Sequence, residues 1–411
     1  MNDLFTAEFF SGNRARLRQL FSGTAPIVLA ANGLLQRGGD AAFCFAQDAS
    51  FWYLTGIEDP DVILVLDKYK DFIILPEHGE TRVTFDGRLD AELISQKSGI
   101  AEIMNSKNGW KHLAQRLKKV SHVATLPVAP VYIEAAGMYV NPARRRLRDQ
   151  IKSLNASIEL LDISKHIARQ RCIKQPAEIA ALQAAIDVTI DTFQDILRPD
   201  NLAKYQFEYQ IEADISRGLR FRGAAGHAFE PIVAGGERAC TVHNFSNNAQ
   251  LQSGELLVLD VGAEAQHYAA DISRTVALNN HPSPRQLAVH EAVSEVQDYA
   301  LSLLKPGLNL KNYEPEICNF MGEKLRELGL IKTILETNVR QFYPHSTSHF
   351  IGLNVHDVGD YSQPLAPGMV LSCEPGIYIK DESIGVRIED DVLITPEGNQ
   401  VLSRRLPRGL V

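Results

Sequence analysis

Apolar positions along the first 160 or so residues follow the pattern of short strands separated by helices. Runs rich in β-branched residues at 26–31, 62–67, 71–76 and 158–163 are each bounded by turn-forming residues, which predicts strands. Apolar residues at helical spacing occupy 89–97 and 109–120, between these runs. This alternation predicts a mixed α/β domain over residues 1–163.

A long helix is predicted near the start of a second domain, residues 164–411. Pro176 lies at the first turn of this helix with Glu178 close behind, and apolar residues recur at helical spacing as far as Leu197. Helices and hairpin-like pairs of strands then alternate to the end of the chain, without a low-complexity linker. The sequence therefore predicts two domains and the α+β class.

The second domain contains an internal duplication. Residues 254–262 and 368–376 share one layout, in which a glycine turn leads into a largely apolar strand, a carboxylate follows, and another glycine stands two residues later. The carboxylates are Asp260 and Glu374, and the returning strands carry Asp271 and Glu389. Two related halves, each a hairpin preceded by helices, would place these four acids symmetrically about a shared centre.

Carboxylates at the ends of such apolar strands need partners. Acidic side chains are rarely buried alone, and four clustered carboxylates would repel one another while desolvation raised their pKa values. Two divalent cations would balance the four negative charges. The alternative is a set of surface acids paired with Arg274 or Arg387, but the duplicated layout favours the metal site.

Three of the twelve histidines, His345, His349 and His356, lie within twelve residues of one another. The first two have the spacing of a helical zinc motif, but Ser346 occupies the position where that motif needs its general-base glutamate, so we reject it. An imidazole among carboxylates is typical of an oxygen-rich site that favours Mn²⁺, Co²⁺ or Fe²⁺. His243 is a weaker site candidate when it is considered alone.

Composition and charge exclude several classes of function. The chain has 411 residues, of which 45% are hydrophobic and 22% charged, as in an ordinary globular protein, and no apolar run reaches the roughly 18 residues of a membrane helix. A net charge of -8 argues against nucleic-acid and anionic-membrane partners. Five scattered cysteines without a Cys-x-x-Cys pair predict buried thiols and a cytoplasmic protein.

In their order along the chain, these residues resemble the metallopeptidases of the pita-bread fold, and more narrowly aminopeptidase P (Xaa-Pro aminopeptidase). The matching motifs are 51–56, 259–275, 345–357, 373–378 and 385–390. Two positions depart from the family pattern. Ala46 stands where the family usually has arginine, and Asn244 follows His243 where tyrosine is common.

The resemblance implies a fold and a role for each site residue. The fold is a creatinase-like α/β domain followed by a pita-bread catalytic domain with an internal pseudo-two-fold repeat. The implied cofactor is a pair of divalent metal ions, Mn²⁺ ahead of Co²⁺, Fe²⁺ or Zn²⁺. The implied metal ligands are Asp260, Asp271, His349, Glu374 and Glu389. The other implied site residues are Glu374 as general acid/base, His243, His345, His356 and Tyr378 on the substrate side, and Arg387 paired with Asp260.

The activity implied by the resemblance is release of an N-terminal residue that precedes proline, by a homo-oligomer of two or four subunits. The closest rival is a Xaa-Pro dipeptidase (prolidase), which shares the ligands but needs a cation for the dipeptide carboxylate. The turn between Tyr378 and Gly385 offers only Lys380 beside two acids, which favours the aminopeptidase. A non-enzymatic pita-bread binding protein is disfavoured, because such proteins usually lose ligands and all five are present.

Overall fold

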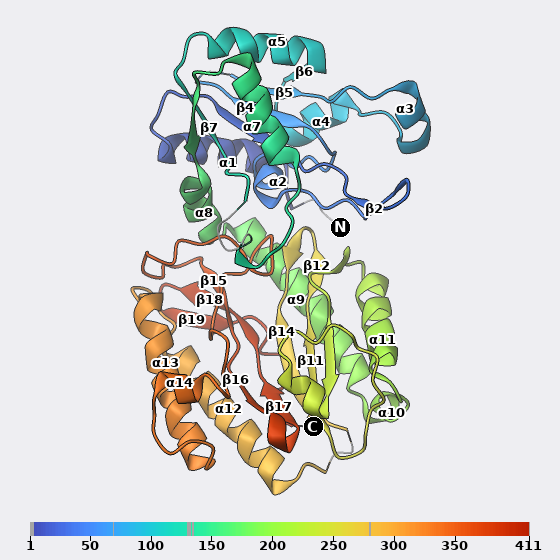
Figure 1. The fold of residues 1–411 in the computed structure, drawn as a ribbon, viewed down its shortest axis with the longest axis vertical. Helices are drawn as coiled ribbons and strands as arrows, with labels where there is room; N and C mark the ends of the chain where they lie inside the picture. Colours follow the sequence, from blue (N-terminus) through green and yellow to red (C-terminus); the bar gives the residue numbers. More distant parts are fainter. Residues whose placement is uncertain (1–3, 69, 130–132, 134, 279–280, 411) are drawn as a thin grey trace. The chain divides into compact units, whose positions relative to one another are not determined.

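The computed structural model describes residues 4–68, 70–129, 133, 135–278 and 281–410 (Figure 1). The chain divides into two compact units, Met1–Gln170 and Arg171–Val411. Helix α8 (Ser164–Cys172) runs across this division, whereas the boundary predicted from the sequence lies just before that helix. Among the described residues, no helix is long and apolar enough to cross a lipid bilayer.

The first unit is built on a six-stranded mixed sheet with the order β6-β5-β4-β1-β7-β8. Its strands are β1 (Ile27–Ala30), β4 (Ile63–Leu66), β5 (Asp71–Ile74), β6 (Glu102–Met104), β7 (His122–Thr125) and β8 (Glu159–Asp162). The central strand β1 runs antiparallel to β4 and parallel to β7. The four predicted strands correspond to β1, β4, β5 and β8, whereas β6 and β7 were not predicted from the sequence.

The other elements of the first unit are helices and a small hairpin. They are α1 (Ala7–Leu20), α2 (Ala49–Thr55), α3 (Glu80–Asp86), α4 (Ala91–Ser98), α5 (Ser106–Leu117) and α7 (Ala143–Leu154), with hairpin strands β2 (Gln36–Gly38) and β3 (Ala41–Ala42). Helix α2 covers the predicted 51–56 motif. The Asp48 carboxylate accepts hydrogen bonds from two N–H groups of its first turn, and Gly56 ends it at φ 68°.

The helices of the second unit begin with α9 (Pro176–Ile196), as the sequence predicted, where Glu178 accepts a hydrogen bond from the Gln175 amide. The others are α10 (Pro199–Leu202), α11 (Glu208–Phe221), α12 (Pro284–Leu303), α13 (Leu310–Glu327) and α14 (Glu336–Val339). The helical pattern of residues 315–328 predicts a helix that begins at Pro315, but α13 begins five residues earlier, at Leu310. Its first turn is capped by the Asn309 side chain, so the proline lies inside the helix.

The strands of the second unit form two related hairpin systems. Strand β11 (Leu256–Val261) pairs antiparallel with β14 (Ile272–Ala277) and with β10 (Ile232–Gly235). Strand β15 (Val370–Cys373) pairs antiparallel with β18 (Asp390–Thr395), which also pairs with β19 (Gly398–Val401). Shorter elements are β9 (Gly226–His227), η1 (Gly236–Cys240), β12 (Ala263–Ala265), β13 (Tyr268–Ala269), β16 (Gly376–Ile379), η2 (Lys380–Glu382) and β17 (Ile384–Arg387).

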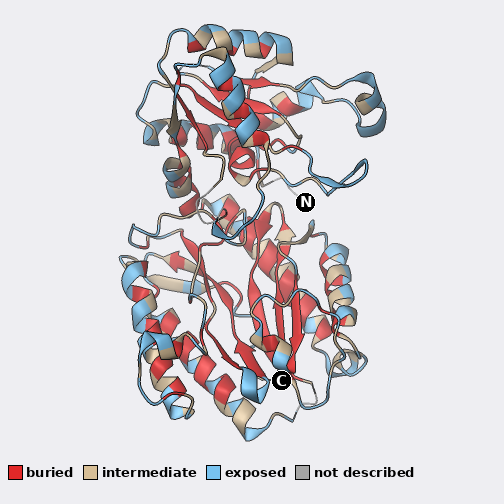
Figure 2. Ribbon diagram, viewed as in Figure 1, coloured by how far each residue is buried: buried red, intermediate tan, exposed pale blue. Residues whose placement is uncertain are grey.

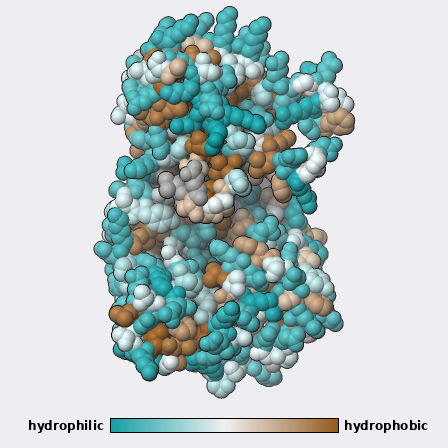
Figure 3. Space-filling model, viewed as in Figure 1, coloured by the Kyte–Doolittle hydropathy of each residue, from teal (hydrophilic) through white to brown (hydrophobic). Residues whose placement is uncertain are grey.

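Burial follows this architecture. The central strands of both units are buried, while the outer faces of the helices are exposed (Figure 2). The surface in Figure 3 is mostly hydrophilic, with apolar side chains in separate groups. The five cysteines are free thiols, and three of them are buried. The prediction that all are buried is wrong for Cys44, which is exposed beside the β2–β3 hairpin, and Cys240 is only partly buried.

Candidate metal centre

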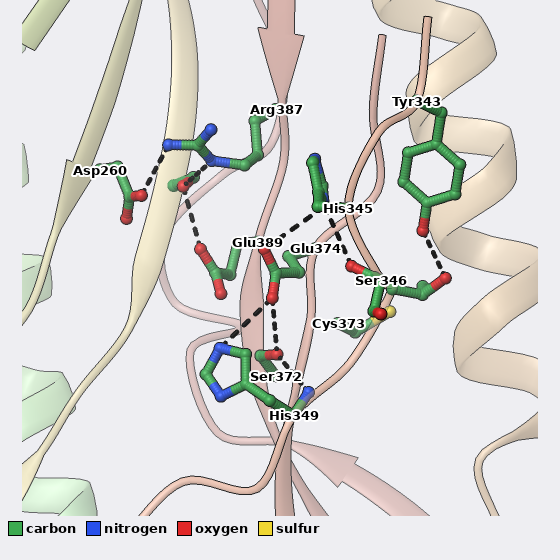
Figure 4. A network of polar contacts seen from close by, with 12 residues as sticks. Asp260, Tyr343, His345, Ser346, His349, Ser372, Cys373, Glu374, Arg387 and Glu389 are labelled. Carbon is green, nitrogen blue, oxygen red and sulfur yellow. Dashed lines mark hydrogen bonds and ion pairs between the residues drawn. The ribbon is translucent and has the colours of Figure 1, made fainter. Parts of the chain in front are cut away.

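Four carboxylates come from strand ends of the two halves, and Figure 4 labels three of them, Asp260, Glu374 and Glu389. Asp260 lies on β11 and Asp271 just before β14, while Glu374 follows β15 and Glu389 precedes β18. In one strand pair Asp260 stands opposite Ser273, two residues after Asp271, and in the other Cys373, directly before Glu374, stands opposite Asp390, directly after Glu389. Each pair therefore brings together the two acids of its own half, although the registers of Asp271 and Glu389 differ by two residues.

A histidine joins these acids. Asp271, His349 and Glu389 each offer one ligand atom, and the three atoms lie within 4.8 Å of one another. His349 Nε2 is 3.4 Å from Asp271 Oδ2 and 3.2 Å from Glu374 Oε1. Its other nitrogen, Nδ1, lies 3.2 Å from the Phe350 carbonyl oxygen and can donate to it. A metal-binding histidine commonly donates in this way from the nitrogen that faces away from the ion.

Two carboxylate oxygens have the surroundings of metal ligands. Asp260 Oδ1 and Glu389 Oε1 are buried and lack a hydrogen-bond partner within the described part of the chain. A buried carboxylate oxygen without a donor is costly, and a cation removes the cost. Four carboxylates and one imidazole form an oxygen-rich donor set, which suits divalent cations such as Mn²⁺. These residues therefore fit divalent metal ions.

The electrostatics of the acids agree with a missing positive charge. Burial, reinforced by the charge of Asp260, raises the pKa of Asp271 to about 7 against the hydrogen bond from His349. Burial also raises the pKa of Glu389 well above its usual range, and the charges of Asp271 and Glu374 add to this effect. Metal-free, this part of the site therefore holds protons that a cation would replace.

Glu374 differs from the expectation that clustering raises the pKa of every acid. Burial alone would raise its pKa, but the hydrogen bond and charge of His349 outweigh burial and lower the pKa to about 2. The same contacts, to Asp271 and Glu374, overcome the effect of burial on His349 and raise its pKa well above the usual range. Glu374 is therefore a carboxylate at neutral pH.

Arg387 links the acids to the substrate-side residues. It donates to Asp260 Oδ2 at 2.6 Å, to Ser273 Oγ at 2.9 Å and to the Tyr378 hydroxyl at 3.0 Å. Ser273 Oγ in turn donates to Glu389 Oε2 at 2.9 Å. The expected contact of Arg387 with Asp260 is present, and the contacts through Ser273 are additional. Arg387 is 2% exposed, so its charge is poorly screened.

His345 contacts residues on both sides of its ring. Its Nε2 lies 2.8 Å from the Tyr378 hydroxyl and its Nδ1 2.9 Å from the Ser346 carbonyl oxygen. Since Arg387 donates to that hydroxyl, the hydroxyl can donate to Nε2, which leaves the ring proton on Nδ1. Nδ1 is also 3.7 Å from Glu374 Oε2. Burial lowers the pKa of His345 and raises that of Tyr378 to about 12.

The other two candidate histidines lie nearer the surface. The ring of His356 is 4.3 Å from that of His349, and loss of hydration followed by the charge of His349 lowers the pKa of His356 to about 4. The charge of His243 contributes to the same shift, so the structure brings these two histidines into one electrostatic neighbourhood. His243 is exposed in a loop, where its ring stacks on Phe245 at 5.6 Å.

The segment that carries His345, His349 and His356 is not helical, which agrees with the rejection of the helical zinc motif. Its far end is fixed by Asp357, whose side chain is 2% exposed and contacts Arg171 and, at 3.7 Å, Lys174. This anchor was not predicted from the sequence. The only signal for it was an acid directly after His356, and its basic partners lie far away in the sequence.

Two further supporting residues were also missed. Ser372 accepts a hydrogen bond from the His349 amide at 3.0 Å and donates to Glu374 Oε1 at 3.2 Å. Asp391 is buried and accepts from the Asp271 amide at 3.1 Å. The acidic run at 389–391 beside an apolar strand was a signal for Asp391. A serine inside a strand offered none.

Comparisons with known proteins agree with this geometry. The model of metallopeptidase family M24 matches residues 179–396, and the model of the aminopeptidase P N-terminal domain matches residues 10–124. Human Xaa-Pro aminopeptidase 3 is 32% identical over 94% of this chain and 80% of its own length. The Xaa-Pro aminopeptidase of Escherichia coli K12 is 30% identical over 98% of this chain and 96% of its own length.

Solved structures show the same fold over nearly the whole chain. A structure described as a putative aminopeptidase P from Bacillus anthracis has a TM-score of 0.89 at 29% identity, covering 98% of this chain and 96% of its own. A zinc-substituted aminopeptidase P from E. coli in complex with product has a TM-score of 0.84 at 27% identity, with the same coverage. The chain therefore belongs to metallopeptidase family M24, combines the aminopeptidase P N-terminal domain with a pita-bread domain, and is a metallo-exopeptidase.

Proposed function

We propose that the protein is a Xaa-Pro aminopeptidase that releases the N-terminal residue of peptides with proline in the second position. It would bind two divalent ions, with Mn²⁺ as the preferred metal. The observation that carries the chemistry is the cluster of Asp271, His349 and Glu389, with ligand atoms within 4.8 Å of one another and Glu374 3.2 Å from His349. The substrate class rests on the relatives named Xaa-Pro aminopeptidase, which match nearly the full chain.

Each metal ligand has a proposed place. Asp260 would bind one ion, His349 and Glu374 would bind the other, and Asp271 and Glu389 would contact both. When bound, such ions lower the pKa of a water molecule and polarise the carbonyl that it attacks. Arg387 pairs with Asp260 Oδ2, and Oδ1 has no partner among the residues that the structure describes, so the arginine orients Asp260 without using both of its oxygens.

Glu374 is the proposed proton carrier. Its side chain is 18% exposed, so the carboxylate reaches solvent while Ser372 and His349 hold one of its oxygens. As a carboxylate it can accept a proton from the attacking water. It would then return that proton to the leaving nitrogen, the usual two-way role of a carboxylate.

The remaining site residues are proposed to contact the peptide. His243 and His356 are both exposed, and their shared electrostatic neighbourhood includes Glu374. A donor from such a group, aimed at the developing negative charge on oxygen, supplies a few kcal/mol. His345 and Tyr378 hold each other and would form a fixed wall on the substrate side.

We also propose a cytoplasmic location and a homo-oligomer of two or four subunits. All five cysteines are free thiols, which suits a reducing compartment. Light scattering coupled to size-exclusion chromatography would measure the mass of the assembly. A monomer at micromolar concentration would contradict the oligomer.

The experiment that tests the function compares substrates with the purified protein in Mn²⁺. We expect Xaa-Pro-Yaa peptides to be cleaved with higher kcat/KM than the Xaa-Pro dipeptide, and a Xaa-Ala-Yaa peptide to serve as the control for proline specificity. Lys380 is 77% exposed and 3.8 Å from Glu237, so it forms a solvated surface pair rather than a buried trap for a dipeptide carboxylate. A dipeptide preferred tenfold, about 1.4 kcal/mol, would replace this proposal with a prolidase.

A further inference from the structure

The backbone between Tyr343 and His349 needs support from outside itself. It carries His345 and His349 but has no regular helix or strand, so its amide groups depend on partners elsewhere in the chain. One partner is in the site already described, since the Glu374 amide donates to the Thr347 carbonyl oxygen at 2.9 Å. Thr347 is fully buried, so its remaining polar groups also need partners.

Those partners come from Glu314, on helix α13. Glu314 Oε2 accepts from the Thr347 amide at 2.9 Å and from the Thr347 hydroxyl at 2.8 Å. Its other oxygen, Oε1, accepts from Arg340 at 2.9 Å, and Arg340 also donates to the His345 carbonyl oxygen at 2.8 Å. One carboxylate on a helix thus holds the loop at two points.

We propose that Glu314 is a positioning residue, which sets the places of Glu374 and His345 through Thr347 and Arg340. The inference rests on the proposed function, because it gives those two residues their roles. The side chains of Glu314 and Arg340 are 24% and 26% exposed, so their ion pair contributes little by charge alone. The contribution is geometric, because losing the acceptor would leave the buried Thr347 amide unsatisfied and free the strand end that carries Glu374.

The test uses Glu314→Ala with a matched control on the same helix. Glu316 contacts the Tyr299 hydroxyl at 2.6 Å on the exposed surface, so Glu316→Ala removes a carboxylate without touching the loop. Partners that orient metal ligands change metal affinity or activity by roughly 10- to 100-fold when they are lost. We expect Glu314→Ala to lower kcat on a Xaa-Pro-Yaa peptide and to weaken Mn²⁺ binding to the metal-free protein by about tenfold each, with KM nearly unchanged. Glu316→Ala should stay within about twofold of the unmodified protein in all three.

A second variant separates positioning from general destabilisation. Glu314→Gln keeps one oxygen that can accept from Thr347 but places an NH2 group beside Arg340, so it should recover part of both losses. The inference is overturned if Glu314→Ala matches the control in kcat and Mn²⁺ affinity, or if Glu314→Gln restores neither. Inactivity of the unmodified protein on every Xaa-Pro peptide would refute the proposed function alone, and the Mn²⁺ titrations would still decide the role of Glu314. Absence of Mn²⁺ binding to the unmodified protein would overturn both.

Discussion

Removing the divalent ions should make the stability of the protein depend on pH, and Asp271→Asn should remove a measurable part of that dependence. Asp271 is 4% exposed and lies 3.4 Å from His349. Its pKa is raised from 3.8 to about 7, first by burial and then by the charge of Asp260, against the hydrogen bond from His349. Without a cation, the folded chain must therefore carry either a protonated Asp271 or a costly buried charge.

The size and sign of the effect follow from the two pKa values. The folded chain binds the proton of Asp271 more tightly than the unfolded chain does, so the destabilisation is absent below about pH 4 and complete above about pH 7. At about 1.4 kcal/mol for each pH unit between these limits, ionising Asp271 costs the metal-free fold roughly 4 kcal/mol. Between about pH 5.5 and pH 7.5, ionisation of Asp271 lowers the free energy of unfolding by about 2 kcal/mol, and this is the share of that one residue.

Urea denaturation of metal-free protein measures this share. The free energy of unfolding should fall from pH 5.5 to pH 7.5 by about 2 kcal/mol more in the unmodified protein than in Asp271→Asn. The subtraction cancels groups that titrate in both proteins without contacting Asp271, such as His356, whose lowered pKa of about 4 stabilises the fold as pH rises. Saturating Mn²⁺ should remove this extra pH dependence of the unmodified protein, because the ion replaces the proton of Asp271 and stabilises the folded state by mass action. Equal pH dependence in the two metal-free proteins would refute the reasoning.

Three substitutions test other parts of the structure. Glu374→Gln should lower kcat by about 10³-fold or more while the thermal midpoint shows a folded protein; more than about a tenth of the activity in Mn²⁺ would contradict its role. Asp357→Asn should cost about 3–5 kcal/mol in urea denaturation, because two buried cations lose their counter-charge, and a cost below about 1 kcal/mol would argue against that anchor. Gly262→Ala should be severely destabilised, since the new Cβ would lie 1.8 Å from the Ala270 carbonyl oxygen, and a melting curve like that of the unmodified protein would exclude this clash.

The elements that could be predicted from the sequence are those whose own residues determine them, through an apolar pattern or through the residues at their ends. Strand β1 is a continuous apolar run, and α9 has a proline start, a capping glutamate and a long apolar face. Strand β6 has only three residues, all partly exposed, and exists because β5 offers it a parallel partner. Such a strand leaves no pattern of its own, which is why it was missed.

The site divides in the same way. Asp260 and Glu374 could be matched from the sequence, because the repeated layout of glycine, apolar strand and carboxylate can be recognised without knowledge of the tertiary contacts. Glu314 and Ser273 could not be predicted, since they act on residues 33 and 116 positions away. The direction of the pKa shift of Glu374 was wrong for a related reason. The pKa of Glu374 is lowered by the contact with His349, whereas the prediction considered only burial and the repulsion among the acids.

Two buried arginines explain why this site can be assembled from two halves before any ion binds. Arg274, from the first half, donates to Asp390 at 2.7 Å and to the Glu389 carbonyl oxygen at 2.6 Å in the second half. Arg387, from the second half, donates to Asp260 in the first half at 2.6 Å. Each arginine is 2% exposed and neutralises an acid of the opposite half. The metal-free fold is therefore held together across the repeat, and the acids whose pKa values are raised, Asp271 and Glu389, are the ones that are proposed to bind both ions.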